Sequence, residues 1–175
     1  MIARLARSPI TWLAVAVLVA ATAIGAVWFQ PWRLFTDVTV SEAPPTAAAD
    51  PAAPEPAAPR VLARGTFLSH EHATSGTVAV LALPDGSRVL RIEDLDTSDG
   101  PDLHVWLSDA PVIDGVSGWG VFDDGRYADL GGLKGNKGDQ NYPVPATVDL
   151  SVLTSVSIWC DRFNVSFGAA ELHPV

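Results

Sequence analysis

The feature that most constrains this chain is an uninterrupted apolar run near its N-terminus. Residues 10–29 form a stretch of twenty residues without a charged side chain. About 20 apolar residues match the hydrocarbon thickness of a bilayer, so this run predicts one helix across a membrane. The chain has 175 residues, and the part after the run is long enough for one modest domain.

The residues around the run predict its orientation. Arg4 and Arg7 precede it, whereas Arg33 is soon followed by acidic residues. Cytoplasmic flanks carry an excess of Lys and Arg, so we expect the N-terminus in the cytoplasm and the rest of the chain outside it. The alternative is a cleaved signal peptide with its small-residue site at residues 21–23, although the run is longer than the about 7 to 15 residues of a signal core.

A low-complexity segment lies C-terminal to the run. Between residues 43 and 59, fourteen of seventeen residues are Ala or Pro, which leaves nothing to pack into a core. Proline at this density favours extended polyproline II at about 3.1 Å per residue, a reach of roughly 50 Å. We therefore expect a disordered linker that holds a globular head away from the bilayer.

The remainder predicts an all-β head. Residues 77–83 and 88–92 are rich in strand-forming side chains and flank Pro84-Asp85-Gly86, which is typical of a hairpin. Further strands are expected at residues 103–107, 156–160 and 163–167, and this spacing indicates a single β-sandwich. The predicted organisation is a cytoplasmic N-terminus (1–9), a transmembrane helix (10–29), a juxtamembrane segment (30–42), the Ala/Pro-rich linker (43–60) and the sandwich (61–175).

Charge and cysteine content exclude several classes of function. The formal net charge is -9, which argues against binding of a nucleic-acid backbone. Cys160 is the only cysteine, so one chain forms no disulfide, no Cys-x-x-Cys redox pair and no c-type haem attachment. No conventional hydrolase or dinucleotide motif is present.

Four stretches of the head carry a distinctive set of motifs. They are Gly65-Thr66-Phe67 with His72 and Ser75-Gly76-Thr77; residues 90–96 with Asp99-Gly100-Pro101-Asp102-Leu103-His104-Val105; Leu130-Gly131 with residues 133–142 and Pro145; and residues 156–163 with Phe167-Gly168. Together these stretches resemble the DM-thirteen domain family, found in animal cell-surface proteins beside cytochrome-like domains and in membrane-anchored or secreted bacterial proteins. In that family a nearly universal cysteine is proposed to act in electron transfer, as a free thiol or as a ligand to a group such as haem. Cys160 occupies the matching position.

Cys160 is the candidate catalytic residue and a candidate cofactor ligand. A bulge or tight turn is expected at residues 160–162, which would place the sulfur at an edge within reach of a partner. Arg162 would favour the thiolate, the reactive and metal-binding form. The alternative is a buried structural thiol, because free cysteine is among the most buried residue types.

His72 and His104 are the candidate companions of this thiol. A Cys/His axial set for haem, or a His/Cys site for copper or zinc, requires these side chains to converge, which their spacing does not establish. Haem and copper are thus the candidate cofactors. The competing interpretation is two surface or locally hydrogen-bonded histidines.

A weaker metal hypothesis concerns calcium. Oxygen-bearing side chains alternate here as they do at the start of a calcium loop, and the motif departs from an EF-hand because Gly100 falls one place late and Val105 stands where the bidentate Glu belongs. The alternative is an acidic turn solvated by water. The candidate ligands are Asp94, Asp96, Ser98 and Asp102.

The leading hypothesis for function is a membrane-tethered extracytoplasmic electron-transfer module centred on Cys160. Membrane lipid would contact the N-terminal helix, and a partner redox protein would be needed because one thiol cannot complete a dithiol cycle. The competing hypothesis is a binding or adhesion module of the cell envelope in which Cys160 is structural.

Overall fold

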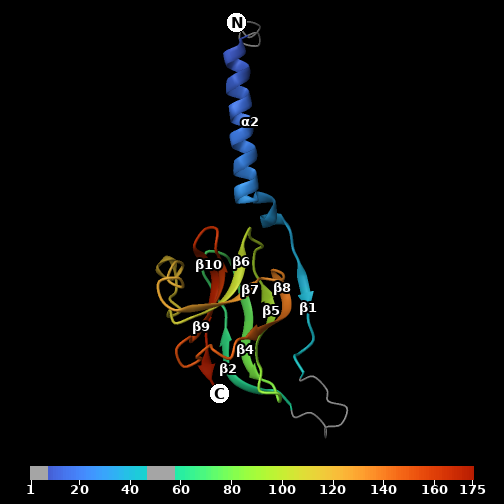
Figure 1. Cartoon of the computed structure of the whole chain (residues 1–175), viewed down its shortest axis with the longest axis vertical. Coiled ribbons are helices and arrows are strands. Elements are labelled where there is room, and N and C mark those ends of the chain that lie inside the picture. The colour runs from blue at the N-terminus through green and yellow to red at the C-terminus, as the bar shows by residue number, and fades with distance from the viewer. Residues whose placement is uncertain (1–7, 47–57) are drawn as a thin grey trace.

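The computed structural model describes residues 8–46 and 58–175, and it shows one helix standing at the end of a β-rich head (Figure 1). Helix α2 (Pro9–Phe29) has a mean hydropathy of 2.3 over its most apolar window and none of that window is buried. Pro9 opens the helix, where its missing N–H costs nothing, and Gln30 ends it in a left-handed conformation. By length and composition this helix can cross a membrane.

The head is a sandwich of two sheets, which confirms the predicted all-β fold. The six-stranded sheet A has the order β1-β8-β5-β4-β2-β11, and the five-stranded sheet B has the order β3-β10-β9-β6-β7. Two short 3-10 helices, η1 (Pro31–Phe35) and η2 (Val116–Gly118), complete the described elements. The strands are β1 (Thr39–Ser41), β2 (Arg60–Thr66), β3 (Leu68–Ser69), β4 (Ser75–Ala82), β5 (Arg88–Asp96), β6 (Leu103–Ser108), β7 (Tyr127–Gly132), β8 (Lys137–Val144), β9 (Ser155–Cys160), β10 (Val165–Glu171) and β11 (His173–Pro174).

The main core lies between the two sheets and results from the alternation of side chains along each strand. On β6, which lies at the strand predicted over residues 103–107, Leu103, Val105 and Leu107 face inward and belong to the same buried cluster as Val80 and Leu90 of sheet A. The predicted hairpin is also present, because β4 and β5 pair across the turn at residues 83–87.

Strand β1 changes the role expected for the Ala/Pro-rich segment. It pairs in parallel with β8, with Thr39 opposite Lys137, so it belongs to sheet A together with β2. The Ala/Pro-rich segment therefore connects two strands of one sheet, and it does not separate the membrane from the head as the sequence suggested. The expectation of disorder concerns chiefly residues 47–57, which lie outside the described residues.

The head also contacts the end of α2 directly. The ring of Phe29 stacks on that of Phe163 at 5.6 Å, and the guanidinium of Arg162 donates to the carbonyl of Trp28 at 2.9 Å. Arg33 pairs with Asp99 at 3.1 Å.

Phe163 was expected to begin a strand over residues 163–167. It instead lies in the turn between β9 and β10 with 41% of its surface exposed, because the chain reverses at residues 161–164.

A second, smaller core covers the outer face of sheet B. Residues 109–126 cross this face and bury Phe122 completely. The strands contribute Trp106 from β6, Trp159 from β9 and Ala169 from β10. Both faces of β9 are consequently buried, and all six of its residues are buried.

Candidate functional site

Cys160 is the last residue of β9, the central strand of sheet B. It lies opposite Leu103 of β6 and Val165 of β10, and it belongs to the main core with none of its surface exposed. The expected turn does come directly after it, but the side chain faces the interior of the sandwich. The sulfur is therefore not at an accessible edge, which corrects that expectation.

The surroundings of Cys160 favour the protonated thiol. Burial raises the pKa of the Cys160 thiol, and the backbone N–H groups of Phe163 and Arg162 oppose that effect. The side chain of Arg162 lies instead over the ring of Trp28, 5.4 Å from its centre. The expectation that the charge of Arg162 favours the thiolate is therefore wrong, since only its backbone N–H lowers the pKa of this thiol.

The two candidate histidines occupy different environments. His104 lies opposite Trp159 in the pairing of β6 and β9, so its side chain shares the outer face of sheet B while Cys160 faces the interior. His72 pairs with Glu71, and its ring lies 3.9 Å from that of Phe167. Cys160 and His104 thus do not form one ligand set, and these two residues do not supply the two axial ligands of one haem.

The predicted calcium ligands are divided between strand β5 and the loop that leads from it to β6. Asp94 and Asp96 belong to strand β5, where the Asp94 N–H donates to the carboxylate of Asp139 at 3.0 Å and Asp96 lies 3.6 Å from Lys137. Ser98 lies in the connecting loop. Asp102 precedes β6, with its carboxylate 3.6 Å from the ring of His104. Within the described ranges, no group of three or more His, Cys, Asp or Glu residues is arranged to hold a metal ion.

Sequence reasoning missed a stack of aromatic rings on the outer face of sheet B. The ring centres of Trp106 and Trp159 are 5.0 Å apart, and those of Trp106 and Tyr127 are 4.1 Å apart with the planes only 8° from parallel. Phe122 meets Trp159 edge-on at 6.3 Å. A signal was present, since the alternation that sends Leu103 and Val105 inward places Trp106 on the opposite face.

A polar group borders this stack beside Trp159. The ring of His104 contacts Asp129 at 2.9 Å through Nδ1 and lies 4.0 Å from Asp161 through Nε2. Burial raises the pKa of Asp161, the charge of His104 lowers it, and the carboxylates of Asp102 and Asp129 raise it. The indole N–H of Trp159 also acts as a hydrogen-bond donor to Asp161.

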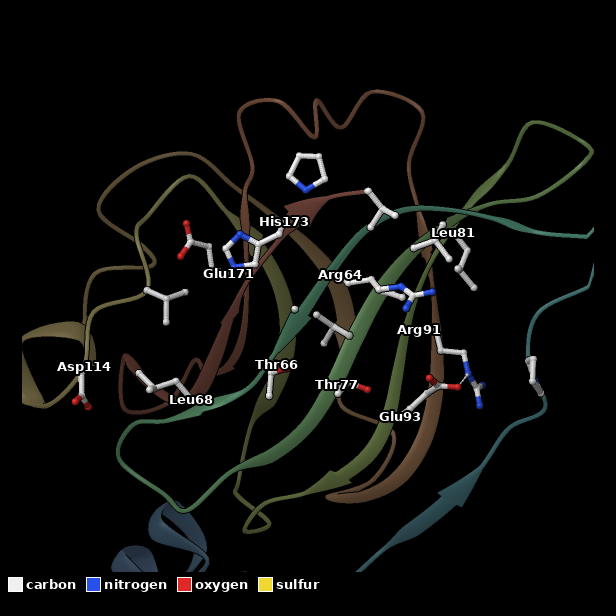
Figure 2. Close-up of a pocket in the computed structure, with 18 residues that line it drawn as sticks. Arg64, Thr66, Leu68, Thr77, Leu81, Arg91, Glu93, Asp114, Glu171 and His173 are labelled. Carbon is white, nitrogen blue, oxygen red and sulfur yellow. Dashed lines mark hydrogen bonds and ion pairs between the residues drawn. The ribbon is translucent and has the colours of Figure 1, made fainter.

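A separate cavity of about 840 Å³ lies on the outer face of sheet A. Figure 2 shows Arg64, Thr77, Arg91 and Glu93 extending from neighbouring strands over this hollow. The side chain of Cys160 lies between the two sheets, whereas this cavity lies on the outside of sheet A. The cavity and the thiol are therefore separate features.

Comparison with known families decides the classification of the chain. The family model described as Electron transfer DM13 matches residues 66–172, which include both faces of the sandwich and Cys160. The chain belongs to the Electron transfer DM13 family. The DM13 match ends at Leu172 in the last strands, and the family description indicates a redox-related role for the head. No curated protein and no solved structure gives a significant match.

Proposed function

We propose that this chain is a membrane-tethered electron-transfer module whose head lies outside the cytoplasm and exchanges electrons with a partner redox protein. The observation that carries the proposal is the Electron transfer DM13 match over residues 66–172. The apolar helix α2 supplies the tether, and Arg4 and Arg7 ahead of it support the orientation.

Burial of Cys160 restricts how such a module works. Thiol-disulfide exchange requires direct attack by a thiolate on sulfur, and the sulfur of Cys160 has no exposed surface. Electrons, unlike sulfur atoms, pass between groups separated by packed protein. In this proposal Cys160 is the redox centre, and its electrons leave the core through the surrounding side chains.

The contacts between the helix and the head support a partner at the membrane. Arg33 pairs with Asp99, and the ring of Phe29 stacks on that of Phe163. These contacts hold the head beside the C-terminal end of α2. A partner would therefore be membrane-bound or associated with the membrane surface.

A second candidate function is a binding or adhesion module. It is favoured by the cavity of about 840 Å³ on sheet A, with Arg64 and His173 among the residues that line it. In that case Cys160 is a core residue alone, and ligand recognition belongs to the opposite sheet.

Film voltammetry of the full chain in lipid nanodiscs separates the two functions, together with an absorbance spectrum of the isolated protein. We expect reversible one-electron oxidation of the wild type and its loss in Cys160→Ala. Val156→Ala is the matched control, because Val156 lies on the same strand and is also fully buried. A wild type that exchanges no electrons would overturn the proposal and leave the binding module.

A further inference from the structure

We infer that the stacked rings of Trp159, Trp106 and Tyr127 carry single electrons between the interior of sheet B and the surface of the head. In this inference the carboxylate of Asp161 accepts the indole proton of Trp159 when that ring is oxidised. The biological purpose of this relay rests on the proposed electron-transfer function, but its physical behaviour can be tested separately.

The geometry of the stack forms a graded path from core to solvent. Trp159 is 1% exposed, Trp106 is 5% exposed and Tyr127 is 48% exposed. Adjacent ring centres lie 5.0 Å and 4.1 Å apart, within the range of direct aromatic contact. Indole and phenol rings are among the side chains most readily oxidised by one electron, so each ring is a suitable stepping point.

The path begins beside the redox centre of the proposed function. Trp159 is bonded through one peptide to Cys160, although the two side chains face opposite sides of β9. At the other end, Tyr127 is on β7, an edge strand of sheet B. A partner that docks over this edge meets an exposed ring with direct contact to the buried pair.

The two indole N–H groups differ in their surroundings, and this difference determines which ring holds the radical. An oxidised indole is a strong acid and loses its N–H proton when an acceptor is present. The buried Nε1 of Trp106 has no hydrogen-bond partner within residues 8–46 and 58–175. Trp159 instead lies opposite His104, whose ring is 4.0 Å from Asp161, and its indole N–H lowers the pKa of that carboxyl as a hydrogen-bond donor. Only Trp159 can therefore relax to a neutral radical by local proton transfer.

Charged groups around Asp161 suit it to that role. His104 Nε2 is 4.0 Å from its carboxylate, and Asp129 and Asp102 both contact the same histidine. These four side chains are partly exposed, between 25% and 44%. The proton therefore has polar neighbours and solvent nearby, while the oxidised ring remains buried.

Atoms and electrons balance in this step. A high-potential one-electron oxidant of the partner, such as a ferryl haem, takes one electron from Trp106 through Tyr127. Trp106 is restored by one electron from Trp159, whose Nε1–H bond breaks as its proton passes to Asp161. The products are a reduced partner centre, a neutral Trp159 radical and a protonated Asp161. Return of one electron and the same proton restores the resting state.

Flash oxidation of the full chain in lipid nanodiscs tests the relay. A laser flash, with a cobalt(III) quencher, converts soluble tris(bipyridyl)ruthenium(II) into a one-electron oxidant, and transient absorption and electron paramagnetic resonance distinguish neutral from cationic indole radicals. In a background that leaves only Trp106 and Trp159, we expect a neutral radical on Trp159. The tryptophans replaced by Phe in that background are Trp12, Trp28, Trp32 and Trp119.

Three variants separate the steps. Trp106→Phe should lose most of the Trp159 radical, and Asp161→Asn should convert the product from neutral to cationic. Trp159→Phe should leave a cation on Trp106. Phe122→Leu is the control, since Phe122 contacts Trp159 edge-on but lies outside the stack, and the radical yield should be unchanged.

An undiminished Trp159 radical in Trp106→Phe would overturn the relay, and a neutral radical in Asp161→Asn would overturn the role of the carboxylate. If Trp106→Phe melts before the measurement, the Trp159→Phe and Asp161→Asn spectra still decide. Reversible one-electron oxidation in voltammetry with no effect of these variants refutes the relay but not the proposed function. Relay behaviour in a chain that fails the voltammetric test supports the relay and refutes the proposed function.

Discussion

Replacement of Cys160 by Ser tests the burial of this thiol. The sulfur is fully buried in the main core, and Ser has a similar size but a polar hydroxyl. The backbone N–H groups of Arg162 and Phe163, which contact the sulfur, can donate to that oxygen, but the hydroxyl hydrogen itself needs an acceptor.

The loss of stability depends on this partial compensation. Burial of a hydroxyl without full hydrogen bonding destabilises proteins by about 1 to 3 kcal/mol. Each kcal/mol lowers Tm by roughly 4 °C in a domain of this size. We therefore expect Cys160→Ser to melt about 4 to 12 °C below the wild type, and Cys160→Ala, which buries no hydroxyl, provides the matched comparison.

Chemical denaturation and maleimide labelling measure the two consequences of burial. The wild-type thiol should react only after the head unfolds, and the Ser variant should unfold at lower denaturant concentration. Rapid labelling of the native chain, or a Ser variant as stable as the wild type, would refute the placement of the sulfur in the core.

Burial of this thiol also predicts a pH dependence. The pKa of Cys160 is higher in the folded chain than in the unfolded chain, so the folded state keeps its proton where the unfolded state releases it. The contribution of the protonated Cys160 thiol to the free energy of unfolding is complete below the unfolded pKa of about 8.5. This contribution is lost as the pH rises above that value. The stability difference between wild type and Cys160→Ala should therefore narrow with increasing pH above that value, and a constant difference would contradict the raised pKa.

Three further predictions concern other parts of the fold. Gly138→Ala should destabilise the head by more than about 1 kcal/mol in denaturant titrations, because Gly138 has φ +89° and an added Cβ would lie 2.1 Å from the carbonyl oxygen of Val40 on β1; Gly86→Ala, with φ +84° and open space, is the milder control. Burial raises the pKa of Tyr142 to about 12, so a difference spectrum against Tyr142→Phe should show no ionisation near pH 10. Protease added outside cells stripped of their outer layer should cut within residues 43–59. The head should nevertheless stay attached until denaturant is added, because β1 lies before the cut and pairs with β8 after it. A chain that the protease does not cut would reverse the predicted topology.

The fold was predictable where one face of a strand repeats apolar residues. Leu103, Val105 and Leu107 are buried on the inner face because a period of two is visible in six residues. Strand β1 was not predictable in this way, since Thr39–Ser41 has no such repeat and its place depends on Lys137, far along the chain. Local sequence does not encode a pairing of that separation.

The candidate site was also predictable only where the alternation of side chains along a strand decides the placement. Alternation placed Cys160 with the inward residues of β9, but the accessible edge expected for it depended on the neighbouring strands, which bury it from both sides. His104 and Cys160 were grouped by chemistry, although pairing of β6 with β9 places them on opposite faces. The covering segment 109–126 carries no regular pattern, so the second core that buries Trp159 became visible only in three dimensions.

Residues 159–162 contribute side chains to the core, to the aromatic stack and to the contact with α2. The end of β9 sends Trp159 outward and Cys160 inward because successive side chains alternate. The chain then reverses, which brings Asp161 back to the outer face beside His104 and directs Arg162 to the carbonyl of Trp28 at the end of α2. Because Asp161 is bonded directly to Arg162, the turn that contacts the end of α2 is also the turn that places Asp161 beside His104.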